Sequence, residues 1–174
     1  MIILLTGPTG SGKTDTSWTL LENVKEMVFL DCDWFASLMP FSWEKESDVE
    51  MVYQALSLMI DFYIKKGHEN FVITLTAEMA LAHQKIDTHF ASKNIDLYRF
   101  RLRCSEQELL RRISQRDRLE TQKQEELKNS IKQQELFDKN FPDNTIFYCI
   151  DGTGKTEQQV ADQILLELRK AKIG

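Results

Sequence analysis

Apolar residues along this chain gather in short runs that alternate with longer amphipathic stretches. Runs of strand character lie at residues 2–5, 27–30, 71–75, 97–104 and 145–150. Between and after these runs, apolar side chains recur at helical spacing, at residues 13–25, 47–66, 77–92, 105–113 and 156–168. Strands that alternate with helices are typical of a parallel sheet covered by helices on both faces. The pattern therefore predicts an α/β fold.

Several of the predicted helices carry start or stop signals. The segments that begin at Ser47, Ser105 and Thr156 have the form of a capping box, in which Glu or Gln follows three residues after Ser or Thr. Gly67 is placed to end the second helix. The first helix is expected to pack inward through residues at helical spacing, which are Trp18, Leu20, Leu21 and Val24.

Residues 114–136 differ from the rest because they are almost wholly polar, with Arg, Gln, Glu and Lys throughout. A helix that is polar on every side is usually solvated rather than part of the core. A polar segment of this kind also suits a mobile lid that closes over a ligand. The sequence leaves both interpretations open.

The composition is that of an ordinary soluble protein. With 174 residues, of which 42% are hydrophobic and 28% are charged, we expect one domain over residues 1–174. The formal net charge is −5, so counterion release does not favour binding to a polyanion and no nucleic-acid partner is expected. No apolar run approaches a membrane span, and Gly7 interrupts the first run, so neither a membrane segment nor a signal sequence is expected.

The cysteines and histidines show no metal-binding pattern. The cysteines are Cys32, Cys104 and Cys149, and each lies in or beside an apolar run. Reduced and buried thiols are therefore expected, which fits a cytoplasmic location. The histidines are His68, His83 and His89. They form no i, i+4 pair, so we interpret them as surface residues rather than ligands.

The residues that follow the first apolar run give the clearest chemical signal. They are Gly7, Pro8, Thr9, Gly10, Ser11, Gly12, Lys13 and Thr14, which fit the P-loop pattern G-x-x-x-x-G-K-[ST]. Such a loop turns its N–H groups toward phosphate oxygens, and the helix that follows adds the positive end of its dipole. Lys13 would reach the β- and γ-phosphates, and the Thr14 hydroxyl would ligate Mg²⁺. The alternative is a glycine-rich turn without function, but the strand–loop–helix context favours a nucleotide site.

Asp31 and Asp33 follow the second predicted strand. Ligands of parallel sheets bind at the carboxyl ends of the strands, so both carboxylates are expected on the same rim as the P-loop. Residues two apart on a strand also face the same side. We expect Asp31 to lie near Mg²⁺ and Asp33 to position a phosphoryl acceptor or take its proton. The alternative is a pair of exposed turn carboxylates that cap the following segment.

Arginines cluster where the polar stretch begins, at Arg111, Arg112, Arg116 and Arg118. Arg112 and Arg116 are four residues apart and share a helix face. Forked guanidinium donors suit a phosphoryl group in transfer, which makes both residues candidate catalytic groups. An ordinary solvated helix with intrahelical ion pairs is the alternative.

Two weaker candidates remain. Gly152 and Thr153 follow the fifth predicted strand and are expected to offer backbone contacts to adenine. The aromatic residues that flank the aspartate pair are Trp34, Phe35, Phe41 and Trp43. They suit core packing and the walls of an acceptor pocket equally well.

These motifs together resemble the small-molecule P-loop kinases. The resemblance extends over nearly the whole chain, through the P-loop, the Asp31-x-Asp33 pair, the Leu-Leu-Arg-Arg-x-x-x-Arg segment at residues 109–116 and the Asp-Gly-Thr turn at residues 151–153. The most similar groups are the shikimate and gluconate kinases, the chloramphenicol phosphotransferase-like enzymes, and the zeta-toxin and polynucleotide-kinase-like ATPases. The resemblance implies a P-loop NTPase fold, a three-layer α/β/α arrangement with a five-stranded parallel sheet in the order 2-3-1-4-5. It also implies a helical lid at about residues 112–140.

The resemblance assigns roles to individual residues. It implies that residues 7–14 bind ATP, that Asp31 helps to hold Mg²⁺, and that Asp33 meets the acceptor hydroxyl. It places Arg112 over adenine and Arg116 at phosphate. Many relatives carry a second Mg²⁺ carboxylate near position 74, where this chain has Thr74. The Mg²⁺ shell is therefore expected to depend more heavily on Thr14 and Asp31.

A further departure concerns the acceptor. Residues 74–77 replace the glycine run of shikimate kinases, and residues 50–60 contain no counterpart of their carboxylate-binding arginine. Shikimate is therefore not expected as the acceptor. The implied activity is ATP-dependent transfer of a phosphoryl group to a hydroxyl of a small molecule, such as a sugar acid, a metabolite or an antibiotic-like compound. The alternatives are a nucleoside, nucleotide or polynucleotide 5′-hydroxyl kinase, and a non-catalytic module that senses ATP.

Overall fold

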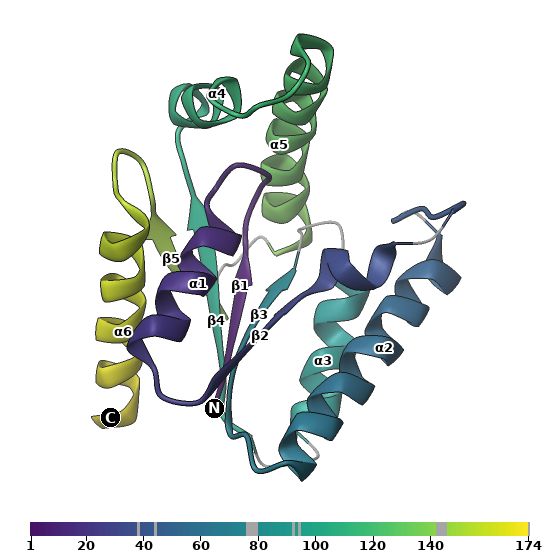
Figure 1. Ribbon diagram of the computed structural model, residues 1–174, viewed down its shortest axis with the longest axis vertical. Helices are drawn as coiled ribbons and strands as arrows, with labels where there is room; N and C mark the ends of the chain where they lie inside the picture. Colours follow the sequence, from purple (N-terminus) through teal and green to yellow (C-terminus); the bar gives the residue numbers. More distant parts are fainter. Residues whose placement is uncertain are drawn as a thin grey trace.

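The computed structural model describes residues 1–37, 39–43, 45–75, 80–91, 93, 95–141 and 146–173 (Figure 1). Its strands are β1 (Ile2–Thr6), β2 (Met27–Asp31), β3 (Asn70–Leu75), β4 (Leu97–Arg103) and β5 (Tyr148–Asp151). Its α-helices are α1 (Lys13–Asn23), α2 (Glu46–Lys65), α3 (Ala80–Ala91), α4 (Glu106–Ser114), α5 (Glu120–Asn140) and α6 (Glu157–Ile173), and a 3₁₀ helix, η1, covers Cys32–Ala36. Strands and helices alternate as the hydrophobic pattern predicted.

All strands belong to one parallel sheet in the order β2-β3-β1-β4-β5, which confirms the expected topology. β1 lies in the centre, between β3 and β4. The register pairs Thr6 with Leu75 and Asp31 with Thr74. The carboxyl ends of β1, β2 and β3 therefore meet at one edge of the sheet.

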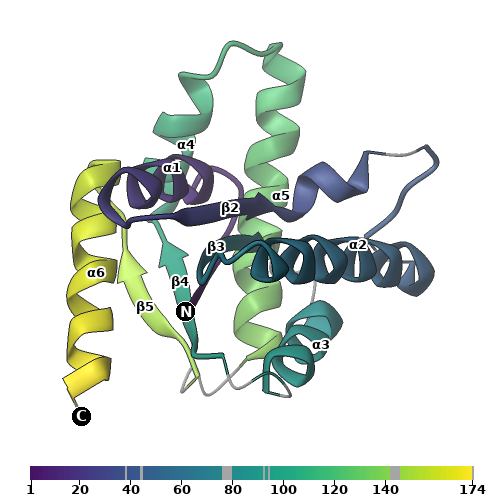
Figure 2. The ribbon, with the colours of Figure 1, turned by 60° about the horizontal axis from the view of Figure 1, so that its bottom comes forward.

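Helices cover both faces of this sheet, so the three-layer arrangement is confirmed (Figures 1 and 2). One face packs against α2 and α3 through buried residues that include Val52, Leu56 and Phe90. The opposite face packs against α1 and α6 through residues that include Leu20 and Ile164. Because both faces are buried, β1 is apolar at every position up to Leu5, as expected for a central parallel strand.

Two of the predicted helix signals are confirmed, and a third is confirmed in part. At Ser105 the hydroxyl accepts a hydrogen bond from the N–H of Glu108 at 3.2 Å, but the Ser105 N–H donates to Thr153 and not to Glu108, so this capping box is incomplete. Thr156 and Gln159 form a complete capping box, because each backbone N–H donates to the other side chain, at 2.9 and 3.3 Å. Gly67, with φ of 92°, ends α2. Local sequence therefore sets these helix ends.

Two predictions about helices are wrong in detail. α2 starts at Glu46, after Lys45 as the N-cap, and the Ser47 hydroxyl bonds to the neighbouring Asp48 instead of capping the helix. In α1 it is Leu20 that is fully buried, whereas Trp18 is 52% exposed and packs by its edge on Phe29. The indole thus covers the end of the core rather than entering it.

Two expectations about single residues are also corrected. Cys149 is exposed because it lies on β5, the edge strand, whereas Cys32 and Cys104 are buried as expected. His83 is only 2% exposed and packs between the rings of Phe141 and Phe147, so it is not a surface residue.

The polar stretch at residues 114–136 begins at the last residue of α4, crosses a break at residues 115–119 and continues into α5, because α4 ends at Ser114 and α5 begins at Glu120. Both stand at the carboxyl edge of the sheet, where the loop after β1 also lies (Figure 1). α5 is not solvated on every side as one interpretation held, since Ser130, Gln133 and Phe137 are buried. The predicted starts of the third helix at residue 77 and of the fifth strand at residue 145 fall outside the described residues. Within the described ranges, no helix is both long and apolar enough to cross a membrane.

Candidate active site

The loop between β1 and α1 has the backbone form of a P-loop. Gly7 has φ of 151° and Gly12 has φ of 91°, in the region that side chains rarely adopt. A Cβ on Gly7 would lie 2.5 Å from the backbone oxygen of Leu102, and one on Gly12 would lie 3.2 Å from Nη1 of Arg112. Space and backbone angle both require glycine at Gly7, and the backbone angle favours it at Gly12.

The loop also leaves donors available for a ligand. In the described part of the chain, no acceptor takes a hydrogen bond from the backbone N–H of Gly10 or Thr14. α1 begins at Lys13, so the positive end of its dipole lies at the same place. Lys13 Nζ donates to the backbone oxygens of Gly7 at 2.8 Å and Pro8 at 3.1 Å, which folds it over the loop. These features fit the phosphates of a nucleotide.

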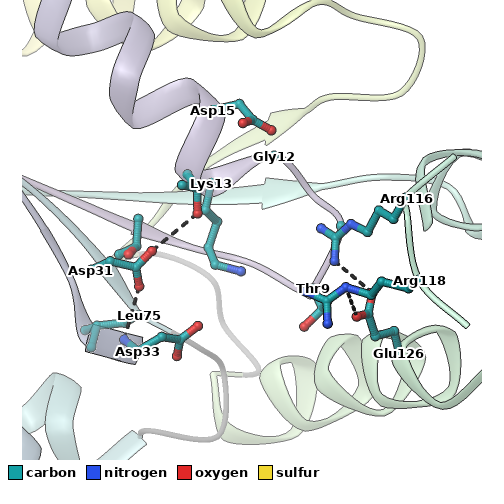
Figure 3. Close-up of a pocket in the computed structure, with 13 residues that line it drawn as sticks. Thr9, Gly12, Lys13, Asp15, Asp31, Asp33, Leu75, Arg116, Arg118 and Glu126 are labelled. Carbon is teal, nitrogen blue, oxygen red and sulfur yellow. Dashed lines mark hydrogen bonds and ion pairs between the residues drawn. The ribbon is translucent and has the colours of Figure 1, made fainter. Parts of the chain in front are cut away.

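A cleft of about 440 Å³ opens beside the loop (Figure 3). It is lined by Thr9, Gly10, Gly12, Lys13, Thr14, Asp15, Asp31, Asp33, Thr74, Leu75, Arg116, Arg118 and Glu126. Figure 3 shows Asp31 and Asp33 on one side of the cleft and Arg116 on the other, with the amine of Lys13 between them. The structure thus gathers Lys13, Thr14, Asp31, Asp33 and Arg116 around one space, although they come from separate parts of the chain.

Thr14 and Asp31 form the part of the cleft that suits a divalent cation. The Thr14 hydroxyl donates to Asp31 Oδ2 at 3.3 Å, and Asp31 Oδ1 accepts from the N–H of Asp33 at 3.1 Å. Hydroxyl and carboxylate oxygens are ligands that Mg²⁺ prefers. Among the described residues, no group of three or more His, Cys, Asp and Glu side chains could hold a metal ion. Mg²⁺ at this position would therefore require phosphate oxygens and water in addition to these two residues.

Asp33 reaches the cleft from η1 rather than from β2. The two aspartates therefore share the cleft through a turn that follows the strand, and not through the alternation of strand residues. Desolvation raises the pKa of Asp33 above 3.8, the charge of Asp31 raises it further, and the charge of Lys13 opposes both effects. The side chain is nevertheless exposed within the cleft. An exposed carboxylate with a raised pKa is suited to accept a proton.

Glu126 of α5 holds the two arginines on the opposite side of the cleft. Its carboxylate pairs with Arg116 Nη1 at 2.8 Å and with Arg118 Nε at 3.0 Å. The side chain of Glu126 is 17% exposed, against 38% for Arg116. Arg116 and Arg118 lie in the break between α4 and α5, so the prediction that Arg116 shares a helix face with Arg112 is wrong, and sequence reasoning based on one helix missed Glu126. No local pattern could have identified it.

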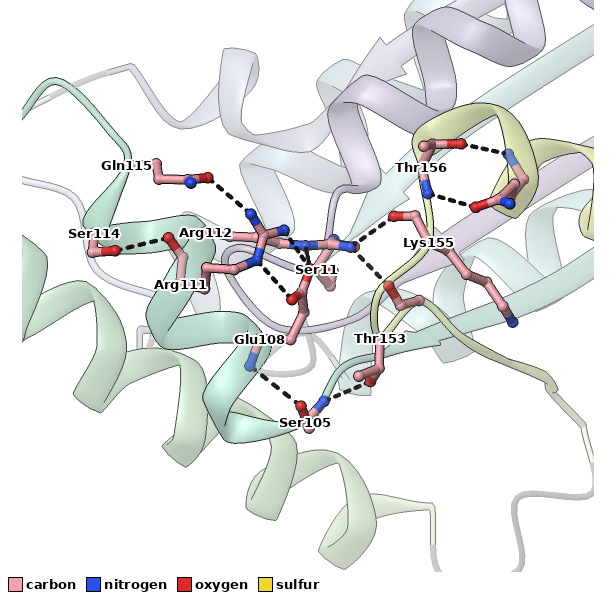
Figure 4. A network of polar contacts seen from close by, with 12 residues as sticks. Ser11, Ser105, Glu108, Arg111, Arg112, Ser114, Gln115, Thr153, Lys155 and Thr156 are labelled. Carbon is pink, nitrogen blue, oxygen red and sulfur yellow. Dashed lines mark hydrogen bonds and ion pairs between the residues drawn. The ribbon is translucent and has the colours of Figure 1, made fainter.

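Arg112 joins the P-loop to the turn after β5 (Figure 4). Its guanidinium donates to the backbone oxygens of Ser11 at 3.0 Å, Gly152 at 2.7 Å and Lys155 at 3.2 Å, and its Nε donates to Glu108 at 2.7 Å. The geometry makes Arg112 a clamp on the backbone, in contrast to Arg116, which lies in the main cleft.

Glu108 is the carboxylate that fixes the Arg112 side chain in this position. Its side chain is 8% exposed, and it accepts hydrogen bonds from Arg111 at 2.8 and 2.9 Å as well as from Arg112. These hydrogen bonds, first that of Arg111 and then that of Arg112, lower the pKa of Glu108 to about 2. The carboxylate is therefore ionised at any ordinary pH.

A second cleft of about 390 Å³ lies beside Gly12 and shares Gly10, Gly12, Asp15 and Arg116 with the main cleft. Its lining residues are Gly10, Gly12, Asp15, Arg111, Arg112, Gln115, Arg116, Lys155 and Glu157. Gly152 and Thr153 are not among them. Gly152 accepts from Arg112, and the Thr153 hydroxyl accepts from the N–H of Ser105 at 2.9 Å. Both residues thus lie beside Arg112, where they shape the turn that borders this cleft.

Thr74 lies at the carboxyl end of β3, next to Asp31 in the register. It is 1% exposed, and its hydroxyl has no hydrogen-bond partner in the described part of the chain.

The aromatic residues that flank the aspartate pair lie mainly against the core. Phe35, Phe41 and Trp43 pack against the core, and Trp34 is 52% exposed. None of the four lines the main cleft. Their described contacts favour the packing interpretation over that of pocket walls.

Comparison with known sequences identifies the family. The model of the family described as "AAA domain" matches residues 3–137, which is most of the chain. This chain belongs to the AAA domain family. The match places the P-loop, both aspartates, α4 and nearly all of α5 inside the AAA domain. No curated protein matches the sequence.

Solved structures confirm the fold of this AAA domain protein as that of P-loop kinases. A gluconokinase from Sinorhizobium meliloti 1021 superposes with a TM-score of 0.69 and 16% identity, covering 97% of this chain and 91% of the other. Shikimate kinase from Acinetobacter baumannii, in complex with shikimate, gives a TM-score of 0.65, 19% identity and coverage of 99% and 95%. Deoxyadenosine kinase from M. mycoides, with bound dCTP, gives a TM-score of 0.54 and 18% identity, covering 98% of this chain and 100% of the other. At these identities the likeness concerns the fold alone.

Proposed function

We propose that this protein is an ATP-dependent phosphotransferase that transfers the γ-phosphoryl group to a hydroxyl of a small molecule. The observation that carries the proposal is the cleft around which Lys13, Thr14, Asp31, Asp33 and Arg116 converge. A phosphate cradle, a cation site and an exposed carboxylate of raised pKa are the parts that phosphoryl transfer requires. ATP and Mg²⁺ are the implied ligands.

In this mechanism the acceptor oxygen attacks the γ-phosphorus and a new P–O bond forms. The bond between the γ-phosphorus and the β–γ bridging oxygen breaks, and ADP leaves with that oxygen. Asp33 takes the proton of the acceptor hydroxyl and later releases it to water. Lys13 and Arg116 stabilise the charge on the phosphoryl group in transfer. Thr14 and Asp31 would hold Mg²⁺, which would offset the negative charge of the phosphates.

Adenine would lie in the second cleft, where the flat guanidinium of Arg112 is available for stacking while its edges bind the backbone. Gly152 and Thr153 would then act mainly through the turn that supports Arg112. This arrangement assigns the phosphates to the P-loop and the acceptor to the side of Asp33.

The moving part of the lid would be smaller than residues 112–140. Arg112 is bound to three backbone oxygens, and the second half of α5 is buried at Ser130, Gln133 and Phe137. We expect closure to involve residues 114–126, which carry Arg116 and Arg118 together with their partner Glu126. The rest of the segment would stay attached to the core.

Two alternative functions remain testable. A nucleoside kinase has the same fold, as the deoxyadenosine kinase from M. mycoides illustrates. Trp34 follows Asp33 and is 52% exposed, but it lies outside the main cleft, so stacking on a base would require it to leave its contact with Phe29. A module that binds ATP without transferring phosphate is the second alternative, supported by Thr74 in place of a second carboxylate. Acceptor turnover distinguishes the three.

The test is an ATP-consumption screen of the full chain over sugars, sugar acids, nucleosides and aminoglycoside- or chloramphenicol-like compounds. Lys13→Ala should lose turnover while the fold persists, and Lys25→Ala, at a side chain that is 91% exposed, is the matched control. Unchanged turnover in Lys13→Ala would remove Lys13 from the mechanism. ATP binding without turnover of any acceptor would favour the sensing module.

A further inference from the structure

Thr9, in the P-loop, is held by two side chains of α5. Its backbone N–H donates to Gln133 Oε1 at 2.7 Å, and its hydroxyl lies 3.2 Å from the same oxygen. The Ser130 hydroxyl donates to the backbone oxygen of Thr9 at 2.7 Å. Both backbone polar groups of this loop residue are therefore bound by one helix that lies more than 100 residues later in the sequence.

Burial makes these hydrogen bonds strong constraints. Ser130 is 0% exposed and Gln133 is 7% exposed, and the two lie three residues apart on the same face of α5. A buried polar group that loses its partner costs free energy, because water cannot replace that partner. The loop conformation that satisfies Ser130 and Gln133 is thus favoured over others.

α5 is itself attached to the sheet next to this contact. Arg101 of β4, which is 1% exposed, donates to Asp138 Oδ1 at 2.6 Å and to the backbone oxygen of Gln134 at 3.5 Å. The Arg101 guanidinium also lies 3.9 Å from the ring centre of Phe137. The position of Thr9 is therefore fixed relative to the central sheet, and not only relative to a surface helix.

α4 holds the P-loop from another side. Arg112 donates to the backbone oxygen of Ser11 at 3.0 Å, and a Cβ on Gly10 would lie 3.2 Å from Cγ1 of Ile113. Between the attachments at Thr9 and Ser11 lies Gly10, whose N–H has no acceptor in the described part of the chain. The two helices thus hold the loop on both sides of a residue that lines the cleft.

We propose that Gln133 and Ser130 are positioning residues for the phosphates of the nucleotide. They act through Thr9, which lines the cleft, and they keep the amides of the P-loop directed toward the phosphate oxygens. The inference rests on the proposed function, because it takes the loop to be the phosphate site. It assigns a binding role to a helix whose sequence is typical of a solvated segment.

The test measures the affinity of the full chain for ATP, ADP and inorganic tripolyphosphate by calorimetric titration, well below the unfolding temperature. Gln133→Met keeps the length of the side chain and removes the acceptor, so affinity for all three should fall about tenfold. Ser130→Ala should lower it by roughly threefold. In the double variant the loss should differ from the product of the single losses, because both residues hold Thr9.

Conservative and matched variants separate positioning from stability. Thr9→Ser keeps all three hydrogen bonds and should bind like the wild type. Gln124→Met changes the same residue type at an exposed position of α5 and should also have no effect. Val160→Ala weakens the core between α6 and the sheet, so it should lower Tm without lowering affinity for tripolyphosphate.

Each outcome decides the proposal. Binding by Gln133→Met within about twofold of the wild type, or an equal loss in Val160→Ala, would overturn it. If Gln133→Met does not fold, Ser130→Ala and Thr9→Val carry the test, since each removes one hydrogen bond only. A wild type that binds tripolyphosphate but phosphorylates no acceptor would contradict the kinase function and leave the positioning role intact. A wild type that binds neither ATP nor tripolyphosphate would contradict both.

Discussion

The hydroxyl of Thr14 lies 3.3 Å from Oδ2 of Asp31, so the first turn of α1 and the carboxyl end of β2 meet at one point. The two residues are 17 apart in the sequence. Their oxygens belong to the types that ligate Mg²⁺, and both line the cleft that also contains Lys13. This contact links the phosphate cradle to the proposed acceptor side.

Asp31→Asn should weaken the binding of Mg²⁺ and so raise the Mg²⁺ concentration that nucleotide binding requires. The substitution keeps the shape and removes the charge, so the concentration of Mg²⁺ that gives half-maximal ATP binding should rise by about tenfold. Affinity for ADP without Mg²⁺ should not fall, because no negative charge is added. Titration of ATP at several Mg²⁺ concentrations measures the effect, with Asp162→Asn on the exposed face of α6 as the control. An unchanged Mg²⁺ requirement would exclude Asp31 from the cation site.

Asp33→Asn should lower phosphoryl transfer by at least about a hundredfold and leave the Kd for ATP unchanged. The amide cannot take a proton from the acceptor, and the role proposed for Asp33 concerns the acceptor and not the nucleotide. Steady-state kinetics and ATP titration measure the two effects separately. An equal loss in both would assign Asp33 to the nucleotide or to the fold.

The pH dependence of the wild type should follow the pKa of Asp33. That pKa is raised above 3.8, and in the proposed mechanism the ionised carboxylate is the active form. The rate should therefore fall as the pH is lowered, with an inflection above 3.8. The ionised carboxylate, which would favour the rate, opposes stability, because a raised pKa means that the fold disfavours the charged form of Asp33. Asp33→Asn should thus unfold at the same temperature as the wild type or higher at pH 7, which thermal denaturation measures.

Arg116→Ala should lower the transfer rate by roughly ten- to a thousandfold with a smaller change in ATP affinity. In the structure Arg116 is paired with Glu126, so it must exchange this partner for phosphate when the nucleotide binds. Rapid-quench measurement of the transfer step tests this, and Arg169→Ala on the exposed end of α6 is the matched control. A rate equal to that of the wild type would show that Arg116 is only a solvated member of the polar segment.

Most of the fold followed from the hydrophobic pattern, because each element buries one face against a single sheet. The strand order came instead from the resemblance to P-loop kinases, and the observed pairing of β1 with β3 and β4 agrees with it. The prediction that failed in α1 placed both Trp18 and Leu20 in the core, whereas only Leu20 is buried. Spacing alone does not decide which of the two faces the sheet.

The candidate site was predictable only where local sequence carries the chemistry. The P-loop and Asp31 lie at the ends of strands, so the topology brings them together. Gln133 and Glu126 were missed because their partners lie in a helix break or near the other end of the chain, and polar residues on a polar helix give no periodic signal. Asp33 was placed correctly in the cleft for an incorrect reason, since a turn and not strand alternation directs it.

Glu108→Gln should destabilise the protein in a way that depends on pH. The pKa of Glu108 is lowered from 4.5 to about 2 by its hydrogen bonds to Arg111 and Arg112, so the folded state prefers the ionised carboxylate. The stability that this provides is complete above pH 4.5 and is lost as the pH falls toward 2. Because Arg111 is 55% exposed and solvent screens its charge, we expect a contribution of about 2 kcal/mol at pH 7.

Urea denaturation of the wild type and Glu108→Gln at pH 7, 5 and 3 measures this contribution. The two curves should differ at pH 7 and 5 and converge as the carboxylate of the wild type becomes protonated. Glu167→Gln, which removes an exposed ion pair on α6, is the control and should shift the midpoint little at any pH. Glu108→Gln should also weaken ATP binding, because Glu108 holds Arg112, which in turn holds Ser11 and the turn at Gly152. A difference in stability that stays constant between pH 7 and 3 would mean that Glu108 contributes through packing and not through its charge.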